Sequence, residues 1–213
     1  MAGAIEAGLT KRLKRALQDD QNDLLDRLRG LRSPQKAAQV LPERADHAAR
    51  FAAACRPFLG EAVVAGATFV TGLLPGVKSG QVPHEPDALV ETLANAVVDP
   101  LRRRLEAVLT AGEGDDTVAL AEQVGVSYRE LKTQRIEAVA SDHVAAAFAQ
   151  GAFAATPPET LLRWLVEDTD GPCADCDDNV LAGGLPKGEP FPTGQRHPPA
   201  HAGCRCLLVP QRA

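Results

Sequence analysis

The sequence predicts a mainly α-helical fold that ends in a small β module, and two features of the chain support this prediction. Up to Ala155, alanine is abundant, and aromatic residues make up only 4% of the whole chain, which favours helices that pack closely through small side chains. Beyond Ala155, apolar and polar residues alternate and glycine and proline become frequent, which is typical of short strands joined by turns. A chain of 213 residues is long enough to bury a helical core without disulfide bonds.

The helices are expected where apolar residues recur with helical spacing. Near the start, leucines follow this spacing from residue 4 to residue 31. Further helices are expected at 35–55 with a break near Pro42, at 62–72, at 86–112 with a kink at Pro100, and at 127–151. Ser33 and Ser127 are the expected N-caps, and Glu130 stands at the position that completes a capping box with Ser127.

The longest uncharged run covers residues 62–77 and contains three glycines and a proline. Its 16 residues are too few and too interrupted for a membrane span. We interpret it as a buried helix that ends near Gly72, and the alternative is a membrane-perturbing segment. The N-terminal residues contain no continuous apolar stretch of the kind found in secretory signals. We therefore expect a reducing compartment.

The segment ATPPET at residues 155–160 breaks the helical pattern. It predicts a helical domain at 1–155 and a separate module at 156–213. Within the module, Leu162, Trp164 and Val166 alternate with polar residues, which predicts a half-buried strand. The residues CRCLLVP at 204–210 predict a second strand. Two short strands and long loops bury little apolar surface, so the module needs a further source of stability.

Four of the five cysteines lie in this module, and they form two groups. Cys173 and Cys176 form a C-x2-C pair, and His201, Cys204 and Cys206 form H-x2-C-x-C. In a reducing compartment, clustered cysteines indicate metal binding more than disulfides. Two ligand pairs, each in a tight turn, can close a tetrahedral site, and thiolate and imidazole ligands favour zinc over magnesium or calcium. A structural Zn²⁺ ion is therefore predicted to hold the module together.

These residues offer five candidates for four ligand positions. We prefer Cys173, Cys176, His201 and Cys204, and Cys206 can replace His201 because it faces the same side of the strand as Cys204. A closed set of four ligands leaves no open position for catalysis. The alternatives are plain buried thiols or a redox C-x-x-C, although CADCDDN lies among acidic and turn-forming residues rather than at the start of a helix. Cys55 is expected to be a small core residue.

The two groups of ligands belong to a longer pattern that resembles the C-terminal signature of the bacteriophage Mu F-like minor head proteins, the head-morphogenesis family. In that signature a tryptophan and an acidic residue precede C-x-x-C, and a Gly/Pro-rich spacer leads to a proline and H-x-x-C-R-C. The residues that match it here are Trp164, Asp168, Cys173, Cys176, Pro199, His201, Cys204, Arg205 and Cys206. The resemblance covers residues 128–210, including a preceding helix, and the first 120 residues carry no family signature.

The resemblance implies a structural phage protein and not an enzyme. It implies a minor capsid component inside the virion, made in the cytoplasm of a bacterial host and acting in head assembly or genome delivery. The expected partners are the portal protein, the major capsid protein or both, with copies of itself and weak contact with packaged DNA as further options, and no membrane. The resemblance implies no catalytic residue and no organic cofactor.

Other charged residues and histidines offer weaker candidates. The net charge of −5 argues against a general nucleic-acid binder. The basic runs 11–15 and 102–104 can contact DNA or an acidic partner, but such runs are usually solvated helix faces. His47, His84 and His143 have no carboxylate or nucleophile at a telling spacing.

The alternative function is a zinc-dependent HNH-like nuclease. It would use His197 or His201 with Asp177 and Asp178 at a second, open metal site. His201 is better explained as a zinc ligand, so this alternative is the weaker one.

Overall fold

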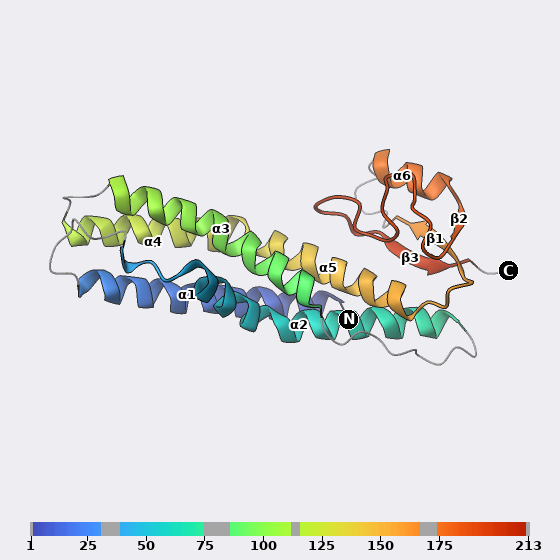
Figure 1. Ribbon diagram of the computed structural model, residues 1–213, viewed down its shortest axis with the longest axis horizontal. Helices are drawn as coiled ribbons and strands as arrows, with labels where there is room; N and C mark the ends of the chain where they lie inside the picture. The colour runs from blue at the N-terminus through green and yellow to red at the C-terminus, as the bar shows by residue number, and fades with distance from the viewer. Residues whose placement is uncertain (1, 31–38, 75–85, 112–115, 167–173, 212–213) are drawn as a thin grey trace. The chain divides into compact units, whose positions relative to one another are not determined.

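The computed structural model describes residues 2–30, 39–74, 86–111, 116–166 and 174–211 (Figure 1). The predicted fold class is confirmed, because helices dominate the described residues and a three-stranded antiparallel sheet lies in the C-terminal part. The elements are α1 (Ala2–Arg29), α2 (Arg44–Leu73), α3 (Asp87–Ala111), α4 (Thr117–Gln134), α5 (Ile136–Ala155), β1 (Leu161–Leu165), α6 (Ala174–Leu181), β2 (Gly184–Pro186) and β3 (Leu207–Pro210).

The chain divides into two compact units. The helical unit contains residues 7–56 and 90–140, and the mixed unit contains residues 1–6, 57–89 and 141–213. As expected, helical structure gives way to strands after Ala155, which is the last residue of α5. The mixed unit nevertheless joins the C-terminal strands to parts of α2 and α5. Independent folding of residues 156–213 therefore stays a prediction.

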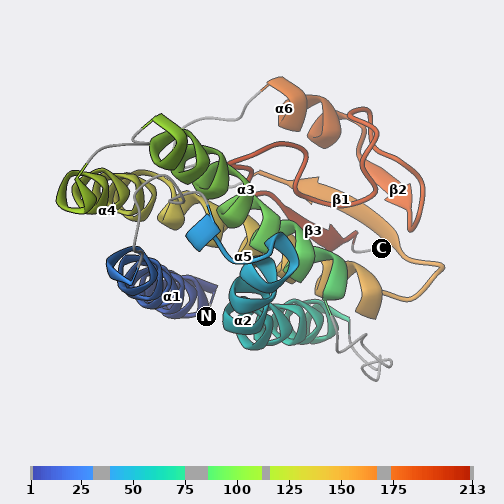
Figure 2. The same cartoon turned by 60° about the vertical axis from the view of Figure 1, so that its left-hand side comes forward.

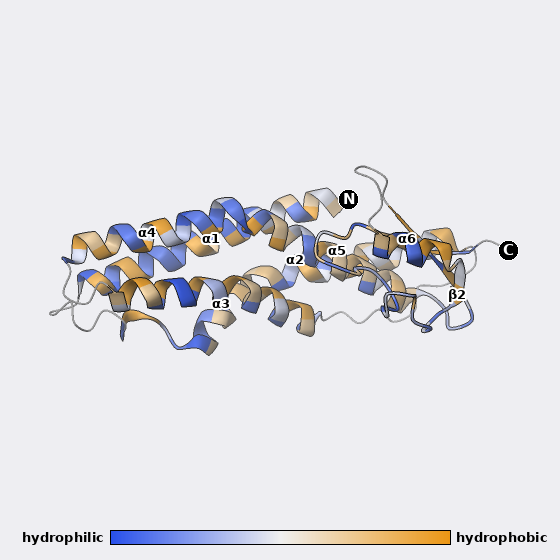
Figure 3. Cartoon of the chain, turned by 90° about the horizontal axis from the view of Figure 1, so that it is seen from above, coloured by the Kyte–Doolittle hydropathy of each residue, from blue (hydrophilic) through white to orange (hydrophobic). Residues whose placement is uncertain are grey.

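The helices of the helical unit are amphipathic, as their leucine spacing predicts. In α1, the buried residues Leu9, Leu13, Leu17, Leu24 and Leu28 are four or seven positions apart. Figure 3 shows hydrophilic and hydrophobic residues alternating along α1 and α4 in the same way. This periodicity places one face of each helix in a core and leaves the other in water.

The second predicted helix differs from the observed one mainly at its end. Its expected start at residue 35 and the expected cap Ser33 lie outside the described part of the chain. The expected break near Pro42 agrees with the start of α2 at Arg44, but α2 continues past the expected end at residue 55, through Pro57, to Leu73. Ser127 does not cap a helix, because it lies buried inside α4 and its hydroxyl donates to the carbonyl of Gln123 at 3.1 Å. The N-cap of α4 is Asp116, whose side chain accepts from the backbone N–H of Val118 at 3.0 Å.

Two glycines bring α2 and α5 into close contact within the mixed unit. A Cβ atom at Gly66 would overlap the carbonyl oxygen of Phe148, and one at Gly151 would overlap the carbonyl oxygen of Val63. The two backbones therefore approach each other more closely than any side chain allows. The glycine at position 151 does not end α5, contrary to expectation, and the helix continues to Ala155.

Helix α2 contains most of the uncharged run, and the prediction of a buried helix there is confirmed. By length and composition alone, α2 is apolar enough to cross a membrane, and half of its apolar window is buried inside the protein. The core residues Ala67 and Val70 pack with Ala152 and Ala155 of α5. The apolar character of α2 thus has an explanation in packing.

The sheet has the order β2-β1-β3, and both neighbours pair antiparallel to β1. Leu162 and Trp164 are buried on one face of β1, which confirms the predicted alternation. Helix α6 contacts β1 and lies over it in both views (Figures 1 and 2). Asn179 of α6 holds the following loop, because its side chain accepts from the backbone N–H of Thr193 at 3.1 Å and donates to its hydroxyl at 2.9 Å.

Candidate metal centre

The core of the C-terminal module contains an unusual share of thiols. Its seven buried residues are Leu162, Trp164, Cys176, Phe191, Cys204, Cys206 and Leu208. Three of these seven are cysteines, and none of them forms a disulfide. The aromatic rings of Trp164 and Phe191 pack edge to face, with their centroids 5.1 Å apart. The apolar part of this core is therefore small, which agrees with the prediction that the module needs another source of stability.

Cys176, Cys204 and Cys206, here called the thiol trio, come from two places in the chain. Cys176 lies in α6, and Cys204 and Cys206 lie just before β3. Their sulfur atoms all lie within 4.8 Å of one another, and the Sγ atoms of Cys176 and Cys204 are 3.9 Å apart. Two sulfurs bound to one tetrahedral zinc ion at about 2.3 Å each would be about 3.8 Å apart. The trio therefore has the spacing of metal ligands.

His201 adds a nitrogen ligand beside the trio. Its Nε2 lies 3.3 Å from Cys176 Sγ, and its Nδ1 lies 2.7 Å from the backbone carbonyl of Ala202. A carbonyl at Nδ1 selects the tautomer in which Nδ1 carries the proton and Nε2 presents a lone pair. Metal-binding histidines usually have this arrangement, with the second ring nitrogen held by a hydrogen bond.

The surroundings of Cys206 also fit a bound cation. Burial raises the pKa of the Cys206 thiol, although the neighbouring Cys176 and the indole N–H of Trp164 oppose the rise. The indole nitrogen of Trp164 is buried and has no conventional hydrogen-bond partner among the described residues. A thiolate at Cys206 would accept from this N–H more strongly than a thiol. A metal ion supplies the positive charge that a buried thiolate requires.

Most, but not all, of the predicted ligands can be placed. The sulfur atoms of Cys176 and Cys204 come together with that of the alternative ligand Cys206, and His201 Nε2 lies beside Cys176 Sγ but is not part of this group of three. Cys173 lies outside the described residues, and so does the matching acidic residue Asp168. The described donors alone, three thiols and one imidazole, are enough for a tetrahedral ion. The choice among His201, Cys206 and Cys173 for the remaining positions stays a prediction.

Cys176 lies in the first half of the helix α6 and not in the predicted turn. Its local structure is therefore compatible with a redox C-x-x-C, but the topology of the sheet is not. The strands on either side of α6, β1 and β2, pair directly and antiparallel, whereas a thioredoxin-like motif belongs to a βαβ unit with parallel strands.

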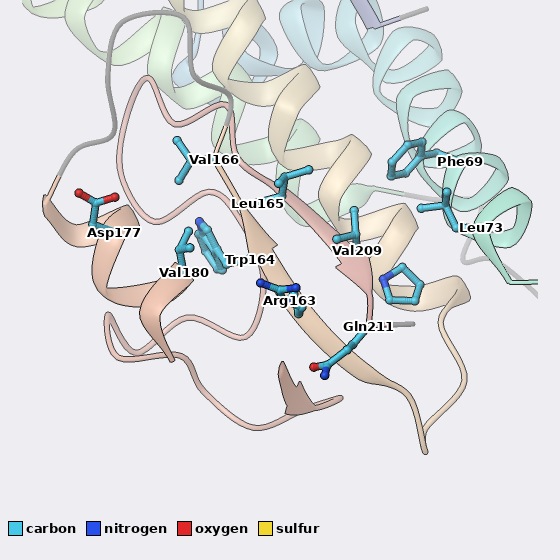
Figure 4. A pocket seen from close by; sticks show the side chains of 11 residues that line it. Phe69, Leu73, Arg163, Trp164, Leu165, Val166, Asp177, Val180, Val209 and Gln211 are labelled. Atoms are coloured by element: carbon cyan, nitrogen blue, oxygen red, sulfur yellow. The ribbon is translucent and has the colours of Figure 1, made fainter. Parts of the chain in front are cut away.

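A groove of about 820 Å³ runs along the sheet (Figure 4). On one side Leu165 and Val209 lie toward Phe69 and Leu73 of α2, and on the other side Trp164 lies toward Val180 of α6. The lining is mostly apolar, and none of the three cysteines of the trio belongs to it.

A second buried polar cluster, in the helical unit, was missed from the sequence. The Asp20 carboxylate lies 2.8 Å from His47 Nε2, accepts from the Tyr128 hydroxyl at 2.5 Å and pairs with Arg50 at 3.2 Å. Burial alone would raise the pKa of Asp20, but His47, Tyr128 and Arg50 outweigh it and lower the pKa. His47 is thus paired with a carboxylate, contrary to the prediction, and His84 lies outside the described residues. Asp20 and His47 are 27 positions apart in the sequence, so no local spacing rule could predict that they pair.

The fifth cysteine is a core residue, as predicted. Cys55 is fully buried in the helical unit, and its Sγ lies 3.4 Å from the carbonyl oxygen of Ala52. Burial raises the pKa of this thiol to about 11. Such a thiol is protonated at neutral pH and unreactive.

The chain matches no protein-family model, no curated protein and no solved structure.

Proposed function

We propose that this protein is a minor head protein of a bacteriophage, of the Mu F-like head-morphogenesis type, and that one structural zinc ion holds its C-terminal module together. The observation that carries the proposal is the convergence of the sequence pattern in space. Trp164, Cys176, Cys204 and Cys206 are spread along the chain, yet they share one small core. This shared core supports the resemblance, because a chance spacing of cysteines would not be expected to bring the residues of the pattern together in one folding unit.

The ligand residues favour a structural role for the ion. The thiol trio is buried, with Cys176 2%, Cys204 3% and Cys206 8% exposed. When bound, the ion would supply cross-links among α6, the turn at His201 and the start of β3. A closed set of sulfur and nitrogen ligands leaves no position for a substrate or an activated water.

The basic runs support a role in protein contacts more than in DNA binding. Lys14 pairs with Glu137 at 2.6 Å, Arg15 with Asp19 at 3.1 Å and Arg104 with Glu130. These cations are therefore largely used inside the molecule. We expect a complex with the portal or major capsid protein that persists at high salt, because packing of apolar helix faces is not screened by ions as exposed charges are.

The test is to follow the protein through particle assembly. We expect the protein in purified particles after nuclease treatment and high-salt washing, and we expect no binding of free DNA by the purified protein at physiological salt. Cys204→Ala should reduce incorporation into particles, and Cys55→Ala, which removes a buried thiol outside the trio, should not. Absence of the wild-type protein from particles, or tight binding to free DNA, would contradict the proposal.

The nuclease alternative has its own test. The ring of His197 packs against that of Phe153, with their centroids 5.0 Å apart, and His197 Nδ1 lies 2.7 Å from the carbonyl oxygen of Pro198. These contacts suit a packing role. Metal-dependent cleavage of plasmid DNA that is lost in His197→Ala would favour the nuclease over the structural protein.

A further inference from the structure

We infer that Asp142 of α5 is a positioning residue for the metal centre, which it supports through the backbone of Gly203 and the guanidinium of Arg205. This inference rests on the zinc site proposed above. One carboxylate oxygen, Asp142 Oδ1, accepts from the Gly203 N–H at 3.1 Å and from Arg205 Nη1 at 2.9 Å. Gly203 directly precedes Cys204, and Arg205 stands between Cys204 and Cys206. A residue of α5 is thus bonded to both neighbours of one candidate ligand.

The segment that Asp142 holds, residues 201–206, carries three of the candidate ligands and is called here the knuckle. Its turn is closed by a hydrogen bond from the backbone N–H of Cys204 to the carbonyl of His201 at 3.2 Å. Gly203 has a φ of 79°, a left-handed conformation that glycine adopts without strain. The Gly203 N–H at the tip of this turn points to Asp142, so the carboxylate sets the orientation of the turn that separates His201 from Cys204.

Arg205 extends the same attachment over two residues of α5. Its Nη2 donates to the Ser141 hydroxyl at 2.7 Å, and its Nη1 also donates to the carbonyl of Cys204 at 3.0 Å. Ser141 in turn donates to Glu6 at 2.8 Å. A planar guanidinium with several donors can hold such a set of acceptors at fixed angles, which an ammonium group cannot do.

These contacts predict a coupling between metal binding and the attachment of the knuckle to α5. Ligands that are already held in place lose less conformational freedom when the ion binds, so the attachment raises metal affinity. Removing a group that orients metal ligands typically reduces affinity by about 10- to 100-fold. The coupling is reciprocal, and a bound ion must therefore strengthen the attachment by the same factor.

The experiment measures zinc affinity of the full-length chain by competition with a chromogenic chelator. Asp142→Ala should raise the zinc dissociation constant about tenfold and speed zinc release. Asp142→Asn keeps an oxygen for the Gly203 N–H and should have a smaller effect. Glu137→Ala is the matched control, because Glu137 is also an acidic residue of α5 in an ion pair but its partner is Lys14. It should leave zinc affinity unchanged.

The outcomes separate this inference from the proposed zinc site. Wild-type protein that binds one zinc ion, with an unchanged dissociation constant in Asp142→Ala, would overturn the role of Asp142 and leave the zinc site standing. Wild-type protein that binds no zinc would overturn both. If Asp142→Ala does not fold, Asp142→Asn and Arg205→Gln decide by the same criterion, and unchanged affinity in both would overturn the inference.

Discussion

The two compact units both bury polar side chains, but they satisfy them in different ways. In the helical unit, Asp20 is surrounded by His47, Tyr128 and Arg50, so the carboxylate finds its donors within the chain. In the mixed unit, the thiol trio brings three cysteine side chains together, and the hydrogen bonds among their sulfur atoms are weak. The first cluster is completed by side chains, whereas the second could hold a metal ion, which would have to come from solution. The stability of the mixed unit should therefore depend on metal supply, and that of the helical unit should not.

The chain carries a separate optical reporter for each unit. Trp164, its single tryptophan, lies in the core that contains the trio. Tyr128, its single tyrosine, contacts Asp20 in the helical unit. Tryptophan fluorescence thus follows one unit and tyrosine absorbance the other.

The largest effect is expected from breaking the trio. Cys204→Ala should strongly weaken metal binding and destabilise the module around Trp164, because zinc contributes about 10–16 kcal/mol to small modules of this kind. Trp164 emission should shift to the red while the Tyr128 signal and most helical circular dichroism persist. Cys55→Ala is the control and should leave Trp164 emission unchanged. Loss of the Tyr128 signal in the same transition would show that the two units unfold as one.

The next largest effect is expected at the contact between α2 and α5. Gly151→Ala places a methyl group on the backbone of Val63 and should lower the free energy of unfolding of the mixed unit by about 3 kcal/mol. Gly72→Ala is the matched control, because a Cβ there has open space, and it should be neutral or slightly stabilising. Denaturant unfolding followed at Trp164 checks both. Equal stability of the two variants would contradict the close approach of these helices.

A smaller effect is expected in the helical unit. Asp20→Ala leaves His47 and Tyr128 buried without their acceptor and should cost about 2–3 kcal/mol. Denaturant unfolding followed at Tyr128 measures this loss, and zinc content should stay at the wild-type value. A loss of zinc in this variant would show that the two clusters depend on each other.

The smallest effect is a dependence on alkaline pH. Burial, together with the charge and hydrogen bond of Asp20, raises the pKa of Tyr128 well above its usual value. Above pH about 10, the unfolded chain loses the phenol proton while the folded chain keeps it, so stability should fall by about 1.4 kcal/mol per pH unit from this group. In Tyr128→Phe this part of the slope should disappear. An unchanged slope would assign the alkaline loss to other groups.

Features that depend on neighbouring residues could be predicted from the sequence. The alternation of Leu162 and Trp164 predicted β1, and the C-x-C spacing predicted that Cys204 and Cys206 lie together. Periodic leucines predicted the core face of α1 because helix geometry repeats every few residues.

Features that depend on tertiary contacts could not be predicted. The bond between Asp20 and Tyr128 joins positions 108 residues apart, and no spacing rule links them. Helix α6 was not predicted, because aspartates and glycines around Cys176 indicate turns. Asp175 and Asp177 also favour the first turn of a helix. Ser127 fitted a capping box by local pattern, yet burial against the helical core places it inside α4.

The metal content of the purified full-length protein tests the central claim most directly. Elemental analysis should find about one zinc ion per chain, because four ligands make one site. In the same sample, Cys176, Cys204 and Cys206 should resist thiol reagents until a chelator removes the ion. A metal-free protein in which these three cysteines react in the native state would contradict the account.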